Sequence, residues 1–207
     1  MPLLPPFHVF RDFLPDAERA ALLDFALASE ESFVPTTIVR NAEAVVDVDS
    51  RISTKLPDLG PFTGRLRRAL RDSSGDIFAR TGVRPFDVGR IEVELVAHND
   101  GAHFARHSDT LAGANRQRGP DGAPADRVVS GVYYFYREPK GFAGGELRLH
   151  AFDFDGAAGD FVDIEPAQNS LLVFPSFAAH EVRRVSCPGR RFEDSRFAVN
   201  CWFHRGA

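Results

Sequence analysis

From Arg90 onward the sequence changes to a twofold alternation of apolar and polar residues, and this change constrains the fold more than any other feature. Clusters of turn-forming residues separate the short alternating runs, and the longest cluster predicts a flexible loop at residues 113–125. This pattern is typical of the strands of a β-sandwich or barrel. The strands expected are residues 90–98, 103–107, 127–136, 145–150, 160–164, 170–174, 179–185 and 196–204.

The first 89 residues have a different pattern, in which apolar residues recur at helical spacing in two segments. Short apolar runs and one polar stretch lie between these segments. The elements expected are helices at residues 16–29 and 62–80, short strands at 7–10 and 33–40, and a mobile polar loop at 41–58.

Together these patterns predict a mainly β chain of the α+β class. The expected fold is a double-stranded β-helix, or jelly roll, with N-terminal helices packed on one sheet. Residues 1–207 are expected to form a single domain. Within it, residues 1–89 would be a helical support region and residues 90–207 the jelly-roll core.

Charge and apolar content argue against several classes of function. The formal net charge of -4 disfavours a general nucleic-acid or membrane-surface binder. No apolar run is long enough to span a bilayer and no signal peptide is evident, so no membrane partner is expected. The two cysteines are compatible with reduced thiols. We expect a cytoplasmic protein that is a monomer or a homodimer.

A candidate metal site is formed by His107 and Asp109, with His180 as a third ligand from far downstream. On an extended strand, side chains at positions i and i+2 point to the same face, so His107 and Asp109 can bind one ion from one side. Two histidines and one carboxylate leave open positions on the metal, which is the facial arrangement of non-haem Fe(II) oxygenases. The spacing alone is weak evidence, because such triplets also occur by chance.

The last expected strand has two different faces. Alternation places Phe197, Val199, Cys201 and Phe203 on an apolar face, and Arg196, Ala198, Asn200 and Trp202 on the other. A guanidinium and an amide would be costly to bury without partners. A dicarboxylate would supply such a partner, because arginine presents a planar fork to a carboxylate.

These residues resemble the 2-oxoglutarate- and Fe(II)-dependent dioxygenases, in particular the prolyl 4-hydroxylase-like branch. The resemblance is strongest from Ile91 to Phe203. The motifs that carry it are the His-x-Asp of His107 and Asp109, the distal His180, the strand Val132-Tyr133-Tyr134-Phe135, the turn Gly144-Gly145-Glu146-Leu147, and Arg196 with its distance to Trp202.

The resemblance implies the cofactor and co-substrates, which are Fe(II), 2-oxoglutarate and dioxygen, with ascorbate as a possible stimulant. It implies that Arg196 and Tyr134 bind the distal carboxylate of 2-oxoglutarate while its keto acid end chelates the iron. The reaction implied is oxidative decarboxylation of 2-oxoglutarate coupled to hydroxylation of an unactivated C–H bond. Because Asp109 fills the third protein position on the metal, hydroxylation is favoured over halogenation.

Two departures from the family pattern leave alternatives open. His98 stands where the family often places a tyrosine; it either contacts the co-substrate or metal-bound water, or is a structural turn residue. The long linker after the distal histidine leaves Arg190 and Arg191 as rivals of Arg196, which is preferred because its strand keeps the right alternation. On this interpretation Trp202, Asn200 and the polar loop at 41–58 with Arg51 face the substrate, and Asn200 is also assigned to the 2-oxoglutarate site. His103 and His150 are expected to be structural.

The substrate implied is a prolyl or other side chain of a peptide or protein, with a free amino acid or small metabolite as the alternative. Two other classes stay open: a metal enzyme such as a cupin-like isomerase, and a non-catalytic metal-binding jelly-roll sensor or binding module. The sequence has no Gly-x-Ser-x-Gly elbow and no phosphate-binding glycine loop, which argues against a serine hydrolase and a nucleotide-driven enzyme.

Overall fold

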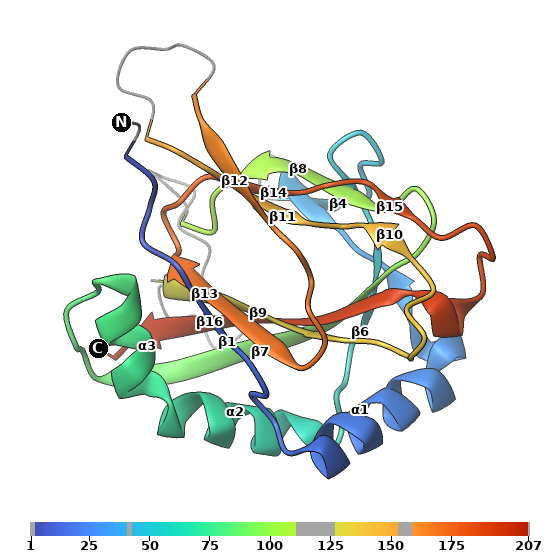
Figure 1. The fold of residues 1–207 in the computed structure, drawn as a ribbon, viewed down its shortest axis with the longest axis horizontal. Helices are drawn as coiled ribbons and strands as arrows, with labels where there is room; N and C mark the ends of the chain where they lie inside the picture. The colour runs from blue at the N-terminus through green and yellow to red at the C-terminus, as the bar shows by residue number, and fades with distance from the viewer. Residues whose placement is uncertain (1–2, 41–42, 111–126, 153–158, 207) are drawn as a thin grey trace.

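Two antiparallel sheets face each other in the structure, a computed structural model that describes residues 3–40, 43–110, 127–152 and 159–206 (Figure 1). In the described part of the chain the larger sheet has seven strands, in the order β1 (His8–Phe10), β13 (Ser170–Pro175), β9 (Arg127–Phe135), β16 (Arg196–Arg205), β7 (Val88–His98), β6 (Thr54–Leu56) and β2 (Val34–Pro35). The smaller sheet has five, in the order β12 (Phe161–Ile164), β11 (Leu147–His150), β14 (His180–Val182), β8 (His103–His107) and β5 (Arg51–Ile52). Two short ladders pair β10 (Ala143–Gly144) with β15 (Val185–Ser186), and β3 (Ile38–Arg40) with β4 (Glu43–Val45).

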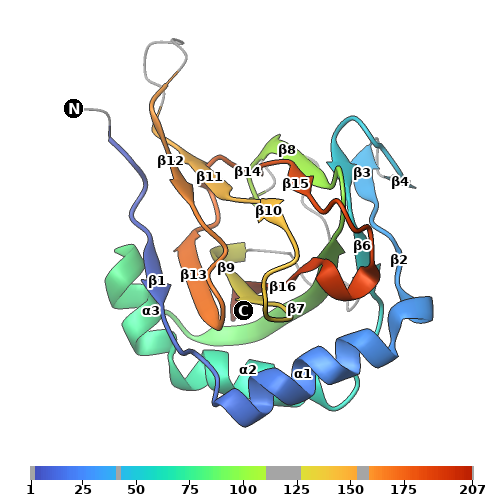
Figure 2. The same cartoon turned by 45° about the vertical axis from the view of Figure 1, so that its right-hand side comes forward.

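The helices α1 (Asp16–Ala28), α2 (Phe62–Asp72) and α3 (Ser74–Thr81) lie on the side of the larger sheet away from the smaller one (Figure 2). Leu22 of α1 and Leu66 of α2 are buried in one cluster with Leu95 of β7 and Phe197 of β16. A second cluster, which includes Val96, Tyr134, Leu149 and Ala198, lies between the two sheets. Neighbouring residues of one strand therefore belong to different layers, as the twofold period requires.

Strand β16 lies between β7 and β9 and has the two faces that its alternation predicts. Phe197, Val199, Cys201 and Phe203 belong to the cluster on the helix side, and Ala198 to the cluster between the sheets. The register places Arg196 opposite His98 of β7. The polar end of β16 is thereby fixed at one end of the space between the sheets.

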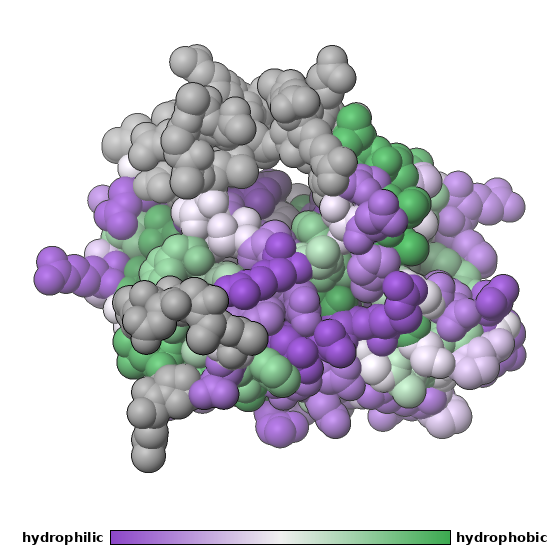
Figure 3. All heavy atoms as spheres, turned by 90° about the horizontal axis from the view of Figure 1, so that it is seen from above, coloured by the Kyte–Doolittle hydropathy of each residue, from purple (hydrophilic) through white to green (hydrophobic). Residues whose placement is uncertain are grey.

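The outer face of the smaller sheet is polar. On β11, Leu147 and Leu149 are buried, whereas Arg148 points outward and forms a bidentate pair with Asp163 of β12 at 2.7 Å. Seen from this side, hydrophilic side chains gather across the middle of the molecule (Figure 3). An antiparallel sheet with one solvated face has this alternation.

Several expected elements differ from the structure. The helix expected at 62–80 is two helices that break at Ser73, where Asp72, Ser73, Ser74 and Gly75 are weak helix formers in succession. The strand expected at 33–40 is divided between β2 and β3, which pair with different partners. The stretch expected to be a loop at 41–58 contains β4, β5 and β6, which are too short to show a period in the sequence. The loop expected at 113–125 lies outside the described residues.

Among the helices that the structure describes, none is long and apolar enough to cross a membrane.

Candidate metal and 2-oxoglutarate site

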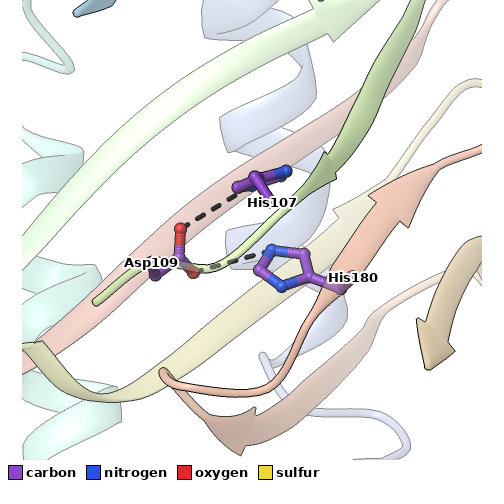
Figure 4. Close-up of side chains that lie close together, drawn as sticks. All are labelled: His107, Asp109 and His180. Carbon is purple, nitrogen blue, oxygen red and sulfur yellow. Dashed lines mark ion pairs between the residues drawn. The ribbon is translucent and has the colours of Figure 1, made fainter. Parts of the chain in front are cut away.

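Three side chains able to bind a metal converge between the sheets: His107 at the end of β8, Asp109 two residues later, and His180 at the start of β14 (Figure 4). β8 and β14 are antiparallel neighbours, with His107 opposite His180. Asp109 Oδ1 lies 3.8 Å from His107 Nε2, and Asp109 Oδ2 lies 3.7 Å from His180 Nε2. One ligand atom from each residue lies within 4.8 Å of the other two, so a single ion fits among them.

Both imidazoles are held with Nε2 toward the carboxylate. Nδ1 of His107 lies 2.8 Å from the carbonyl oxygen of Ala105, and Nδ1 of His180 lies 2.9 Å from that of Ala178. Since a carbonyl only accepts, each Nδ1 carries a proton, and each ring turns Nε2, the atom left to bind a metal, toward the carboxylate. Burial, and then the neighbouring His180, lower the pKa of His107, so its imidazole is neutral at pH 7.

Two serines orient the carboxylate of Asp109. The hydroxyl of Ser130 on β9 donates a 2.6 Å hydrogen bond to Asp109 Oδ2, and Ser176 lies 2.9 Å from Ser130 Oγ. Burial alone would raise the pKa of Asp109, but the two histidines and the Ser130 hydrogen bond hold it below its ordinary value. The group is therefore an anion, as a metal ligand must be.

A buried arginine with unpartnered nitrogens lies in the same cavity. Arg196 is 1% exposed, and its Nη1 donates to Nδ1 of His98 at 3.3 Å. Its Nε and Nη2 have no hydrogen-bond partner among the described residues, and neither does the buried hydroxyl of Tyr134. The guanidinium lies over the Tyr134 ring, 4.8 Å from its centroid. Three unpartnered donors so close together predict an anionic ligand that accepts from them.

His98 is a neutral partner of this arginine. It is 3% exposed, and burial together with the charges of Arg196 and Arg51 holds its pKa well below the ordinary value. Because arginine only donates, His98 accepts at Nδ1 and carries its proton on Nε2. It therefore leaves the positive charge of Arg196 uncompensated.

Gly145 makes room for the arginine. Its φ is 74°, and a Cβ on it would lie 2.6 Å from Arg196 Cδ. The second glycine of the Gly-Gly turn is thus required both by its backbone conformation and by the side chain packed against it.

The triad and the arginine line one cavity, with about 490 Å³ of empty space, open mouth included. Asn200 and Trp202, both expected to face the substrate, line it from β16, and Arg51 lines it from β5. Arg127 lies over the Trp202 ring at 3.8 Å and 4.0 Å from Asp109 Oδ1, so it stands beside the metal position.

The rival arginines lie elsewhere. The side chain of Arg190 is 77% exposed and pairs with Asp100 at 3.1 Å, and that of Arg191 is 61% exposed and pairs with Asp194 at 2.8 Å. Each exposed guanidinium is already paired with a carboxylate of the same chain. The geometry therefore favours Arg196.

The two remaining histidines of interest lie off the ligand set. Nδ1 of His103 lies 3.2 Å from the carbonyl oxygen of Gly101, and its Nε2 lies 3.3 Å from that of Asp49. His150 lies 4.0 Å from Glu181. Neither residue lines the cavity, in keeping with the structural role expected for both.

Sequence reasoning missed Ser130, Ser176 and Arg127. Ser130 could have been found, since it stands four residues before Tyr134 on the same strand and alternation sends both to one face. Arg127 could not, because the register shifts between Phe203 and His204 where Arg127 pairs.

This donor set fits Fe(II) and 2-oxoglutarate. Two imidazoles and one carboxylate suit a ferrous ion with open positions. The unpartnered Arg196 and Tyr134 suit the far carboxylate of a dicarboxylate. A metal triad and a carboxylate pocket between the sheets of a jelly roll define the class of non-haem iron oxygenases that use a keto acid.

Comparison with known proteins gives the family. The profile of the 2OG-Fe(II) oxygenase superfamily matches residues 93–204, and the chain belongs to this superfamily. Fe(II), 2-oxoglutarate and dioxygen are its cofactor and co-substrates, as expected from the sequence. An uncharacterized PKHD-type hydroxylase of Synechocystis sp. is 32% identical over 199 residues, which are 94% of this chain and 62% of that relative. The chain thus spans less than two thirds of that relative's length.

Solved structures show the same fold. A Pseudomonas putida prolyl-4-hydroxylase is 22% identical with a TM-score of 0.67, covering 98% of this chain and 94% of its own. A prolyl hydroxylase from Trichoplax adhaerens, in complex with a hypoxia inducible factor peptide fragment, is 18% identical with a TM-score of 0.68, covering 97% and 84%. The family profile confirms the predicted family, and these neighbours show that the fold is the same.

Proposed function

We propose that this protein is an Fe(II)- and 2-oxoglutarate-dependent dioxygenase that hydroxylates an unactivated C–H bond. The observation that carries the proposal is the buried charge of Arg196, which lines one cavity with the triad and has two nitrogens without a described partner. Its guanidinium lies over the ring of Tyr134, whose hydroxyl also lacks a described partner. A metal-binding sensor would need the triad but not a buried carboxylate pocket next to it.

His107, Asp109 and His180 would hold Fe(II). When bound, the metal would supply the oxidising chemistry: 2-oxoglutarate, dioxygen and R–H are converted to succinate, carbon dioxide and R–OH. The protein's own part is to keep three positions on one side of the ion, which the Nδ1 hydrogen bonds of both histidines and the Ser130 hydrogen bond to Asp109 support.

Arg196 and Tyr134 would bind the distal carboxylate of 2-oxoglutarate. Burial raises the pKa of the Tyr134 hydroxyl, so it remains a donor. Arginine remains charged because its ordinary pKa is far above neutrality. His98, through its Nε2–H, would donate to the co-substrate or to a metal-bound water, and Asn200 would line the same space.

The substrate we propose is a prolyl or other side chain of a peptide or protein, presented past Trp202 and Arg51. The prolyl hydroxylases that share the fold support this proposal, and a free amino acid or small metabolite is the alternative. Asp109 on the metal favours hydroxylation over halogenation.

The test follows 2-oxoglutarate turnover. Protein loaded anaerobically with Fe(II) is exposed to dioxygen and ¹³C-labelled 2-oxoglutarate, with and without a proline-containing peptide library, and succinate is measured by NMR. We expect succinate from the parent protein and none from His180→Ala, with Arg191→Ala as the matched control that keeps the parent rate. An iron-loaded protein that forms no succinate under any of these conditions would refute the proposal.

Five expectations stay predictions. They are a single domain over residues 1–207, a monomeric or homodimeric state, a cytoplasmic location, stimulation by ascorbate, and the lack of nucleic-acid and membrane partners.

A further inference from the structure

A second cleft opens directly from the metal cavity. It holds about 1210 Å³ of empty space, open mouth included. Five of its lining residues also line the metal cavity: Arg51, Phe104, His107, Asp109 and Trp202. A substrate that places a carbon at the metal would therefore extend into this cleft.

The described lining of the cleft is strongly cationic. Arg51, Lys55, Arg106 and Arg127 line it, and apart from the ligand Asp109 its one described carboxylate is that of Glu94. The full chain carries a net charge of -4, so the cleft is positive in an acidic protein. A concave surface with one sign of charge concentrates ligands of the opposite sign.

Glu94 is shared between two of these cations. Its Oε1 lies 3.3 Å from Arg51 Nη2 and its Oε2 lies 3.3 Å from Lys55 Nζ. Both distances exceed the roughly 2.7–2.9 Å of a short charge-assisted hydrogen bond. One carboxylate therefore balances two cations through long contacts, and one positive charge is left over.

Arg106 and Arg127 differ in whether a carboxylate balances their charge. Arg127 is paired with Glu92 at 3.0 Å, whereas exposed Arg106 has no ion pair or hydrogen bond with any residue the structure describes. Within the described part of the chain, the uncompensated charge of the cleft thus comes from Arg106 and from the Arg51–Glu94–Lys55 group. A cationic substrate would be repelled here, and a neutral one would leave both charges unused.

We propose that the primary substrate carries a carboxylate that binds Arg106 and the Arg51–Lys55 pair while its target carbon lies at the metal. This inference rests on the proposed function and adds the substrate class to it. The shared chemistry is a carboxylate within reach of the oxidised carbon, on an acidic peptide segment or on a small carboxylic acid.

The test measures binding by equilibrium dialysis. Zn(II) replaces Fe(II) and 2-oxoglutarate is saturating, so that probes do not enter the Arg196 pocket. The radiolabelled probes are N-acetyl-Asp-Pro-Asp-amide, the matched N-acetyl-Asn-Pro-Asn-amide, and N-acetyl-aspartate amide as the small carboxylic acid. We expect the Asp tripeptide to bind about tenfold more tightly than the Asn tripeptide at low salt, since two partly exposed ion pairs contribute.

Variants locate the effect. Arg106→Gln and Lys55→Gln should each weaken the Asp tripeptide about threefold to fivefold and leave the Asn tripeptide unchanged. Glu94→Gln should tighten it about threefold, because both cations are then free for the ligand. Arg68→Gln, on the exposed face of α2, is the matched control with no expected change. A merely structural ion-pair group predicts weakening by Glu94→Gln, the opposite sign.

Each outcome decides the inference. Equal binding of the Asp and Asn tripeptides, no binding of any of the three probes, or an Asp preference that survives Arg106→Gln with Lys55→Gln overturns it. If N-acetyl-aspartate amide binds as tightly as the Asp tripeptide, the carboxylate belongs to a small molecule; if much more weakly, to a peptide. 2-Oxoglutarate binding is measured first in every sample. If the protein does not bind 2-oxoglutarate, the proposed function fails. If it binds 2-oxoglutarate but shows no preference for the Asp tripeptide, only this inference fails.

Discussion

Replacing Arg196 with methionine should stabilise the protein in the absence of metal and 2-oxoglutarate, although it removes a group needed for function. Two unpartnered nitrogens of Arg196 are buried, and each such donor costs about 1–3 kcal/mol. The substitution gives up the hydrogen bond to His98 and the contact with the Tyr134 ring, each worth about 1 kcal/mol. The net expectation is a gain of about 1–3 kcal/mol in the free energy of unfolding, as when a buried charge is replaced by an apolar residue of similar length.

Urea unfolding without metal or 2-oxoglutarate measures the gain. With Zn(II) held constant, 2-oxoglutarate at about one hundred times its Kd should then add about 2.7 kcal/mol to the parent protein and much less to Arg196→Met. Arg68→Met, at an exposed position of α2, should change neither quantity by more than about 0.5 kcal/mol. If apo Arg196→Met is less stable than the parent by more than about 1 kcal/mol, Arg196 is satisfied within the fold and the argument for a carboxylate pocket is refuted.

Three further predictions concern the support of the site and the surrounding sheet. Ser130→Ala should weaken metal binding about tenfold or more, because Asp109 loses the hydrogen bond that orients it; competition with a metal-sensitive dye measures this. Gly145→Ala should lower the free energy of unfolding by about 2 kcal/mol or more in urea, since a Cβ would meet Arg196 at 2.6 Å from a backbone with φ of 74°. Glu92 has a pKa of about 2, because hydrogen bonds from its two basic partners outweigh the effect of burial. The stabilisation by the Glu92 charge is therefore full above the unfolded pKa near 4.5 and is lost as pH falls toward 2. Because 34% of the side chain is exposed, we expect it to be about 1–2 kcal/mol. The difference in urea stability between the parent and Glu92→Gln across this pH range measures it.

Each of these has a result that contradicts it. Metal affinity in Ser130→Ala equal to that of Ser176→Ala and of the parent would mean that Asp109 is oriented without the serine. Unchanged stability of Gly145→Ala would show that the turn can move away from Arg196. A stability difference between the parent and Glu92→Gln that stays constant from pH 6 to pH 2 would show that the Glu92 pairs do not contribute through its charge.

The sequence predicted the parts of the fold where strands are long. β7, β9 and β16 lie within two residues of their expected bounds, because nine or more residues of alternation specify both period and face. The same alternation indicated which face of β16 carries Arg196, Asn200 and Trp202. Strands of two or three residues, such as β2 and β5, have no period to detect, and their pairing is set by the long strands beside them.

The sequence predicted the metal-binding residues of the candidate site, but not the residues that orient them. The spacing of His107 and Asp109 alone predicted that both reach one ion, although Asp109 lies in a bend just after β8. The partner that orients Asp109 comes from β9, which only the fold brings near. The choice among three arginines likewise depended on burial: only the folded chain shows that Arg196 lacks a carboxylate partner while Arg190 and Arg191 each have one.

The central claim is that 2-oxoglutarate binds at the triad with its far carboxylate on Arg196. Its most direct test is an anaerobic titration of the Fe(II)-loaded protein with 2-oxoglutarate, following the weak visible charge-transfer band of a chelated keto acid. We predict a band in the parent that is absent in His180→Ala and forms only at much higher 2-oxoglutarate concentration in Arg196→Ala. Iron that binds while no band forms at any concentration, or a band formed equally well by Arg196→Ala, would contradict the account.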